Sequence, residues 1–282
     1  MRNAKRISII ATFLIIVGVI GILFTFSTAF GQQDTVTKEQ VIKDDINVLH
    51  IEIDNGSAEV YPTNEEEVSL TLEARNPEDI LTTDLSDDTF SIIVKEKQKK
   101  WFNFGLPFKY PKLKVYVPEK DFAEFVVKSD NGRIKTEGIQ AETITVSTDN
   151  GRVDVANVSG TTVEAQTNNG KINLKDVVAS HSTVTADNGK IVLDQVDGDI
   201  VSRAGNGAIS LKTDDMNRNI DLTTSNGKID IDTENKPTNA VMDIQVGNGK
   251  VRVFGQSTWD TVIGNGDNVI KLRTSNGAIT VD

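Results

Sequence analysis

The chain has 282 residues, a formal net charge of −11 at pH 7 and no cysteine. The absence of cysteine excludes disulfides, thiolate metal sites and cysteine nucleophiles. The acidic balance disfavours a nucleic acid as partner, because phosphate backbones are bound by clustered lysine and arginine. A chain of this length can hold one large domain or two small ones.

An uncharged, strongly apolar stretch covers residues 7–30 and follows the basic residues Arg2, Lys5 and Arg6. About 20 helical residues span the ~30 Å hydrocarbon layer of a bilayer. The stretch therefore predicts a transmembrane helix, or an uncleaved signal anchor. By the positive-inside rule, residues 1–6 form a cytoplasmic tail and the rest of the chain lies outside the cell. A cleaved signal peptide ending at Ser27-Thr28-Ala29 is the competing interpretation. Residues 31–45 are polar and predict a stalk.

From residue 129 the sequence repeats a unit built on Asn-Gly. Its glycines stand at 132, 151, 170 and 189, a spacing of 19 residues, and the rhythm continues more loosely to Gly277. Mostly apolar residues stand two and four positions after each glycine, and again six and four positions before each asparagine. Polar residues lie between them. This alternation predicts two half-buried strands in every unit.

A fixed period of this size is typical of a solenoid. We therefore predict an all-β fold, a right-handed parallel β-solenoid with coils of about 19 residues and two main strands per coil. An antiparallel arrangement is the alternative, because Asn-Gly is also a common hairpin turn. In a solenoid the turns would stack into a ladder at one corner. Its predicted members are Asn131, Gly132, Asn150, Gly151, Asn169, Gly170, Asn188, Gly189, Asn206, Asn226, Gly227, Asn248, Gly249, Asn276 and Gly277.

The solenoid is expected to cover residues 46–282. Residues 46–128 show the same alternation less regularly, beginning around Asn55-Gly56, and are interpreted as an irregular N-terminal cap; residues 129–282 are the regular repeats. The last predicted coil ends on Thr280-Val281-Asp282 with no further segment to cover it. Because an unpaired edge strand invites pairing, we expect weak end-to-end self-association there.

Within the cap, residues 95–114 combine many lysines with aromatic side chains. Such a composition predicts a loop that contacts an anionic lipid surface or a partner. The alternative is a loop that folds its aromatic rings over the end of the solenoid. The candidate contact residues are Lys99, Lys100, Trp101, Phe102, Phe104, Phe108 and Tyr110.

The sequence contains no recognisable catalytic or metal-binding motif. Its two histidines, His50 and His181, have no partner at metal-ligand spacing. No phosphate-binding glycine loop or nucleophile elbow is present. We therefore predict no cofactor, no metal and no enzymatic activity. Beside the turns stand a mostly acidic column and a cation column. The first holds Asp130, Asp149, Asn168 and Asp187, and the second holds Arg133, Arg152, Lys171, Lys190, Lys228 and Lys250. The two columns are expected to screen each other, with cation binding or catalysis as alternatives.

The strand Val115-Tyr116-Val117-Pro118, followed by serial Asp-Asn-Gly-Arg/Lys-Ile/Val turns, resembles the bacterial "putative adhesin" β-solenoid family of unknown function. The basic N-terminus and single span are similar to the LiaG-like membrane-anchored envelope proteins of Gram-positive bacteria. The resemblance covers residues 46–282 and the topology. It implies an anchored extracellular domain linked to envelope-stress signalling through neighbouring membrane proteins, and it carries over no catalytic residues.

The predicted function is thus a non-enzymatic interaction or accessory module of the cell envelope, on the cell membrane with its C-terminal domain outside. Binding of wall polymer or carbohydrate, in the manner of an adhesin, is the first alternative. A polysaccharide-modifying enzyme is the second.

Overall fold

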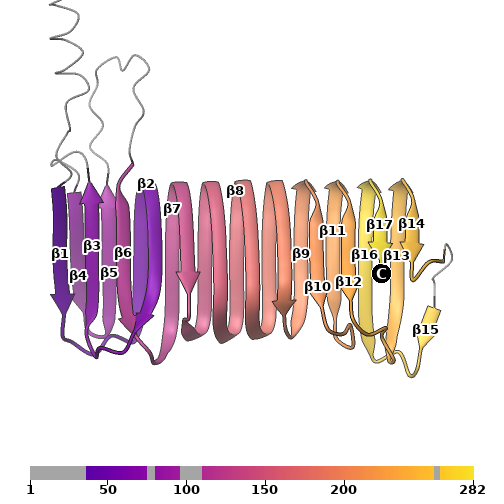
Figure 1. Ribbon diagram of the computed structural model, residues 1–282, viewed down its shortest axis with the longest axis horizontal. Coiled ribbons are helices and arrows are strands. Elements are labelled where there is room, and N and C mark those ends of the chain that lie inside the picture. The colour runs from indigo at the N-terminus through magenta and orange to yellow at the C-terminus, as the bar shows by residue number, and fades with distance from the viewer. Residues whose placement is uncertain (1–35, 75–79, 96–109, 257–260) are drawn as a thin grey trace, which may run out of the picture. The chain divides into compact units, whose positions relative to one another are not determined.

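The computed structural model describes residues 36–74, 80–95, 110–256 and 261–282. In these residues the chain forms one sheet of 17 strands and no helix (Figure 1). The prediction of an all-β, solenoid-like fold is confirmed. The chain divides into two compact units, residues 1–36 and 37–282, and the second unit contains the coils.

The predicted tail and transmembrane segment lie outside the described residues. Among the residues that are described, no helix is long and apolar enough to span a membrane. Within the predicted stalk, Val36–Ile42 forms strand β1, and the Ile42 side chain is buried. This segment has too few alternating apolar residues, Ile42 among them, for its sequence to predict a strand.

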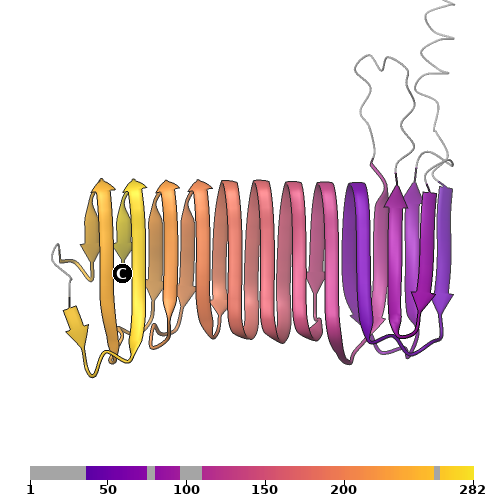
Figure 2. The ribbon, with the colours of Figure 1, turned by 180° about the vertical axis from the view of Figure 1, so that it is seen from behind.

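The regular coils are two long strands that turn corners without losing their ladder hydrogen bonds: β7 (Asp121–Glu137) and β8 (Gln140–Val196). They pair in parallel, with Asn131 opposite Asn150 and Gly132 opposite Gly151. The limb before each Asn-Gly corner and the limb after it lie on opposite sides of the core, as the views from the front and from behind show (Figures 1 and 2). The apolar side chains of both limbs fill the space between them and are fully buried.

At the N-terminal end, β2 (Val48–Thr63) is itself a regular coil, since it pairs in parallel with β7 and places Asn55 opposite Asn131. On its other side it pairs in parallel with β5 (Thr89–Lys95) and β6 (Lys112–Pro118). Antiparallel strands then close the end: β4 (Ile80–Ser86) on β5, and β3 (Val68–Ala74) on β6. β1 pairs with β3. Strands β3 to β6, in the described part of the predicted cap, and β1 therefore lie outward of a regular first coil.

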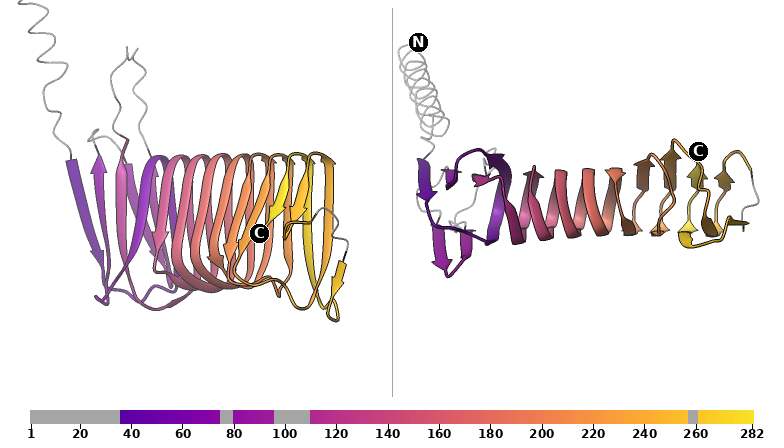
Figure 3. Two further views of the ribbon diagram at one scale, coloured as in Figure 1. Left: turned by 45° about the vertical axis from the view of Figure 1, so that its right-hand side comes forward. Right: turned by 90° about the horizontal axis from the view of Figure 1, so that it is seen from below.

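Short strands make up the coils at the C-terminal end, which Figure 3 shows from two further sides. The limbs before the corners are β9 (Asp199–Asn206), β11 (Ile220–Asn226), β13 (Ala240–Asn248) and β16 (Asn268–Asn276). The limbs after the corners are β10 (Ile209–Thr213), β12 (Ile229–Thr233), β14 (Val251–Val253) and β17 (Ile279–Val281).

These coils do not stack in the order of the sequence. β16 lies between β11 and β13, and β17 lies between β12 and β14, so the last coil of the chain is paired on both sides. The expected open edge at Thr280–Asp282 is therefore wrong. The outermost described coil is β13–β14, and β15 (Thr261–Ile263) pairs antiparallel with its first three residues. The longest connection between coils, residues 254–267, allows the chain to double back past a coil that it has already formed.

This order of coils makes a prediction about stability. Leu272 and Ile244 are register partners in neighbouring coils, but Leu272 is in the interior coil and fully buried, whereas Ile244 in the outermost coil is 8% exposed. We expect Leu272→Ala to lower the free energy of unfolding by about 2–5 kcal/mol, and Ile244→Ala to lower it by less. Urea denaturation measures both. A stack in sequence order would put Leu272 at the end and reverse the ranking.

Candidate binding face

The Asn-Gly corners form a continuous ladder of side-chain amides. Each asparagine after Asn55 donates from Nδ2 to the Oδ1 of a neighbour in the adjacent coil, over 2.8 to 3.1 Å, and Asn55 only accepts. The structure brings together all the predicted ladder asparagines and adds Asn55, which the prediction did not include. In spatial order the ladder runs through Asn55, Asn131, Asn150, Asn169, Asn188, Asn206, Asn226, Asn276 and Asn248.

The glycine after each ladder asparagine is required by the close approach of the coils. A Cβ built on Gly170 would lie 1.5 Å from the carbonyl oxygen of Gly151, and the same contact recurs along the corner. No other residue fits there without moving backbone atoms. The sequence motif therefore fixes where each coil sits on the next one.

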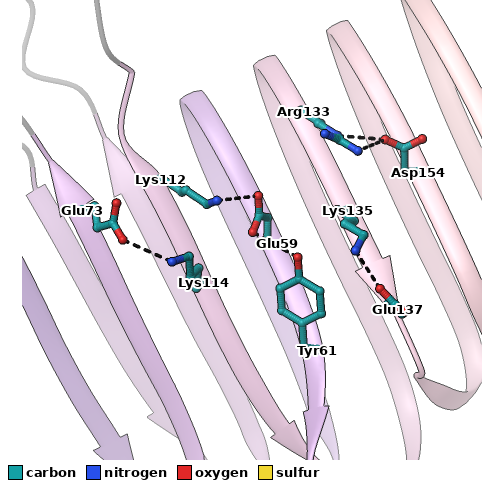
Figure 4. A network of polar contacts seen from close by, with 9 residues as sticks. All are labelled: Glu59, Tyr61, Glu73, Lys112, Lys114, Arg133, Lys135, Glu137 and Asp154. Carbon is teal, nitrogen blue, oxygen red and sulfur yellow. Dashed lines mark hydrogen bonds and ion pairs between the residues drawn. The ribbon is translucent and has the colours of Figure 1, made fainter.

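The strands that follow the corner present an outward surface that we call the second-limb face. Figure 4 shows its N-terminal part. The rings of Tyr61 on β2 and Tyr116 on β6 lie with their centroids 5.9 Å apart. Lys135 Nζ lies 4.8 Å from the centroid of the Tyr61 ring, and the Tyr61 hydroxyl donates to Glu59 Oε2 over 3.1 Å. The register of three strands thus builds a tyrosine pair bordered by charges.

Three ion pairs lie on this face; two of them join neighbouring strands and the third lies within β7. Lys112 Nζ lies 2.8 Å from Glu59 Oε1, Lys114 Nζ lies 3.2 Å from Glu73 Oε1, and Lys135 Nζ lies 2.7 Å from Glu137 Oε2. Partial burial raises the pKa of Glu59, but the hydrogen bonds from Lys112 and Tyr61 outweigh it and hold this pKa below its usual range. The hydrogen bond to Glu73 raises the pKa of Lys114, and the bond to Glu137 raises that of Lys135.

Asp154 is a nearly buried carboxylate that holds two arginines from neighbouring coils. Its Oδ2 lies 2.8 Å from Arg133 and its Oδ1 lies 2.7 Å from Arg152, while its side chain is 9% exposed. The turn acids Asp130 and Asp149 have no ion pair with these arginines in the described structure, so the predicted screening by turn acids is wrong there. Strand alternation explains this, because an acid before the corner and a cation after it lie on different outer faces.

The other candidates from the sequence are scattered. His50 Nε2 lies 3.6 Å from Glu124 Oε2 on the opposite face, and His181 Nδ1 lies 3.9 Å from Asp199 Oδ2 at the looser corner. Within the described ranges, no group of histidine and acidic side chains could hold a metal ion. Lys99, Lys100, Trp101, Phe102, Phe104 and Phe108 lie outside the described residues. Tyr110 is described and is 61% exposed.

The model of one protein family, Toastrack DUF4097, matches residues 48–282. The chain belongs to the Toastrack DUF4097 family. The match begins where β2 begins, at the first regular coil, so β1 lies outside it. This family match supports the predicted resemblance to a β-solenoid-like, adhesin-like family. It does not single out the LiaG-like proteins.

Solved structures of similar fold have low sequence identity to this Toastrack chain. A "putative adhesin" from Bacteroides fragilis is 14% identical, with 89% of this chain and 98% of that one covered and a TM-score of 0.53. A "putative lipid binding protein" from Parabacteroides distasonis is 16% identical, with 89% and 98% covered and a TM-score of 0.50. At this identity they establish the fold alone. Neither is described as an enzyme. No curated protein matches the chain.

The ion pairs of the face predict a pH dependence. The pKa of Glu59 is lower in the folded chain than the ~4.3 of an unfolded glutamate, so its contribution to stability is present above that pH and is lost as the pH falls through the folded pKa. We expect Glu59→Gln to lower the free energy of unfolding by about 0.5–1.5 kcal/mol at pH 7, and the difference from the parent to shrink below about pH 4.

Urea titrations of both proteins across this pH range measure the effect. Glu164→Gln, a change at an exposed glutamate on the opposite face, is the matched control and should be nearly neutral at both ends of the range. A difference between Glu59→Gln and the parent that stays the same from neutral pH to about pH 3.5, below the pKa of an unfolded glutamate, would contradict the assignment.

Proposed function

We propose that this Toastrack protein is a non-enzymatic interaction module of the cell envelope: a right-handed parallel β-solenoid held by residues 7–30 on the outer side of the cell membrane. The observation that carries the proposal is the register of the coils, which turns single repeat positions into long rows of outward side chains. Solenoids use such extended surfaces to bind partners. The names of the similar structures, adhesins and a lipid-binding protein, agree with binding as the activity.

The described ends of the strands support an orientation. β5 ends and β6 begins on either side of the Asn55-Gly56 corner, because Val94 is the partner of Ile53 and Lys112 the partner of Ser57. β1 begins at the same edge (Figure 1). The predicted anchor precedes β1, and the lysine and aromatic segment lies between β5 and β6. Both predicted membrane contacts therefore leave the domain at its N-terminal end, and we propose that this end of the solenoid, not the whole length of the Asn-Gly corner, faces the bilayer.

The link to envelope-stress signalling rests on the resemblance to the LiaG-like proteins. Its test is co-purification of specific membrane proteins with the tagged full-length chain from envelope-stressed cells, using unstressed cells as control. The alternative of a polysaccharide-modifying enzyme predicts turnover of wall polymers or uronates by the purified protein. The interaction module predicts none.

The location is tested by fractionation. We expect the full-length chain in the membrane fraction, and we expect protease added to intact cells to degrade its C-terminal domain. Deletion of residues 1–30 should leave the protein in the cytoplasm. Release of the intact domain into the medium would favour the cleaved signal peptide, and protection of the domain in intact cells would contradict an extracellular location.

The membrane-facing end makes a separate prediction. Changing Trp101 and Phe104 to Ser removes apolar area that would insert at a lipid interface. We expect binding of residues 37–282 to anionic vesicles to weaken by about tenfold, with little change in the free energy of unfolding. Val178→Ser, at an exposed apolar residue of the looser corner, is the control and should not change binding. Unchanged binding by the double variant, or no binding by the parent, would sink this prediction.

A further inference from the structure

A narrow row of cations runs along the second-limb face beside the amide ladder. We call Arg133, Arg152, Lys171 and Lys190 the cation row. Each stands two residues after a ladder asparagine, and those asparagines are hydrogen bonded from coil to coil. Coils in parallel pairing lie about 4.8 Å apart, so consecutive charges of the row are separated by roughly that distance. Four like charges at this spacing are unfavourable unless an anion lies against them.

The protein's own acids neutralise only part of the row. Asp154 holds Arg133 and Arg152, and even so their side chains stay 49% and 47% exposed. No ion pair joins Lys171 or Lys190 to an acid in the described ranges. The row thus keeps a surplus of positive charge on a chain whose net charge is −11. A segregated surplus of this kind is the electrostatic mark of a surface for anions.

The acidic residues on both sides of the cation row limit the shape of the anion that can bind there. Across the corner, on the ends of the first limbs, lie Asp130, Asp149 and Asp187. Further along the second-limb face lie Glu137, which pairs with Lys135, and Asp194, while Lys175 pairs with Asp176. The positive strip is therefore narrow and is bordered by carboxylates along most of its length. A flat layer of anionic lipid headgroups would meet these carboxylates and be repelled by them. A single extended chain could lie along the strip and avoid them.

The chemical groups of the row suit phosphate. Arginine guanidinium groups donate two parallel hydrogen bonds to phosphate oxygens, and lysine contributes a compact charge. The neighbouring ladder asparagines lie at the exposed corner, where their amides are accessible to hydroxyl groups of a polymer. We propose that the cation row binds a linear polyanion of the envelope, a polyol chain joined by phosphodiesters, which runs parallel to the stacking direction of the coils.

The ligand class rests on the proposed function, because the domain must lie outside the membrane to meet such a polymer. The test uses the full-length chain in a neutral detergent and immobilised poly(glycerol phosphate), with neutral dextran as the uncharged reference. We expect binding to the polyphosphate chain and none to dextran, with affinity that falls steeply as salt is raised.

The decisive variant changes Lys171 and Lys190 to Gln. It should weaken binding about five- to tenfold and reduce the salt dependence, since two charge-assisted contacts are lost. The matched control changes Lys228 and Lys250 to Gln. These lysines occupy the same repeat position and the same face but lie beyond the row, and their loss should leave binding unchanged. Both pairs are at the surface, and equal urea midpoints for the two variants verify that folding is unaffected.

Three results would overturn the inference: no binding by the parent, equal weakening by both pairs, or stronger binding to anionic vesicles than to the polymer with the same dependence on Lys171 and Lys190. A failure of this ligand assignment can be told apart from a failure of the proposed function. A domain that fractionation places outside the cell but that does not bind the polymer refutes the ligand alone. A domain found inside the cell refutes the proposed function even if the polymer binds in solution.

Discussion

The close approach of successive coils at the Asn-Gly corner is the constraint on which the structure depends. A Cβ on any corner glycine from Gly132 onward would collide with the carbonyl oxygen of the glycine in the adjacent coil, and the adjoining asparagines join the coils through their side-chain amides. One corner is therefore held in register from end to end. The opposite corner has no such ladder among the described residues, and there the connections differ in length and contain most of the irregular backbone of the regular coils.

Registry at that corner also builds the surface. Once Asn131 lies opposite Asn150, every residue at a given distance from the corner lies beside its equivalents, so apolar positions form two walls of a core and polar positions form rows on the outside. The burial of Ile134, Val153 and Ile172 and the cation row beside the ladder come from the same register. A binding surface of this kind needs no pocket, because its specificity comes from the spacing of charges along a line.

The sequence predicted what is local and periodic. The 19-residue spacing, the inward ladder of apolar side chains and the corner asparagines all follow from residues within one unit and its repetition. The order of the coils at the two ends could not be predicted in this way, because coils of nearly equal sequence can exchange places without changing any local pattern. β2 lies inside the cap strands, and β16 lies inside β13, because long connections permit it.

The details of the binding face also depend on which strands lie side by side, and the sequence does not show this. Tyr61 and Tyr116 become neighbours only because β6 lies against β2, a pairing that joins residues far apart in the chain. The sequence does show Asp154 two residues after Arg152, but it does not show that Arg133 of the neighbouring coil shares the same carboxylate. The predicted self-screening of the turn residues failed because alternation sends the acids and the cations to different faces. That failure is also what leaves Lys171 and Lys190 available for a ligand.

The most direct test of the corner constraint compares two glycine substitutions in their effect on the free energy of unfolding. Gly170→Ala would place a methyl group 1.5 Å from a backbone oxygen, whereas Gly255→Ala meets nothing within 4 Å and suffers only the strain of its positive φ of 79°. We predict a loss of about 1–2 kcal/mol for Gly255→Ala, and a much larger loss, or no folded protein, for Gly170→Ala. Equal losses for the two variants would contradict a structure held in register by contact at that corner.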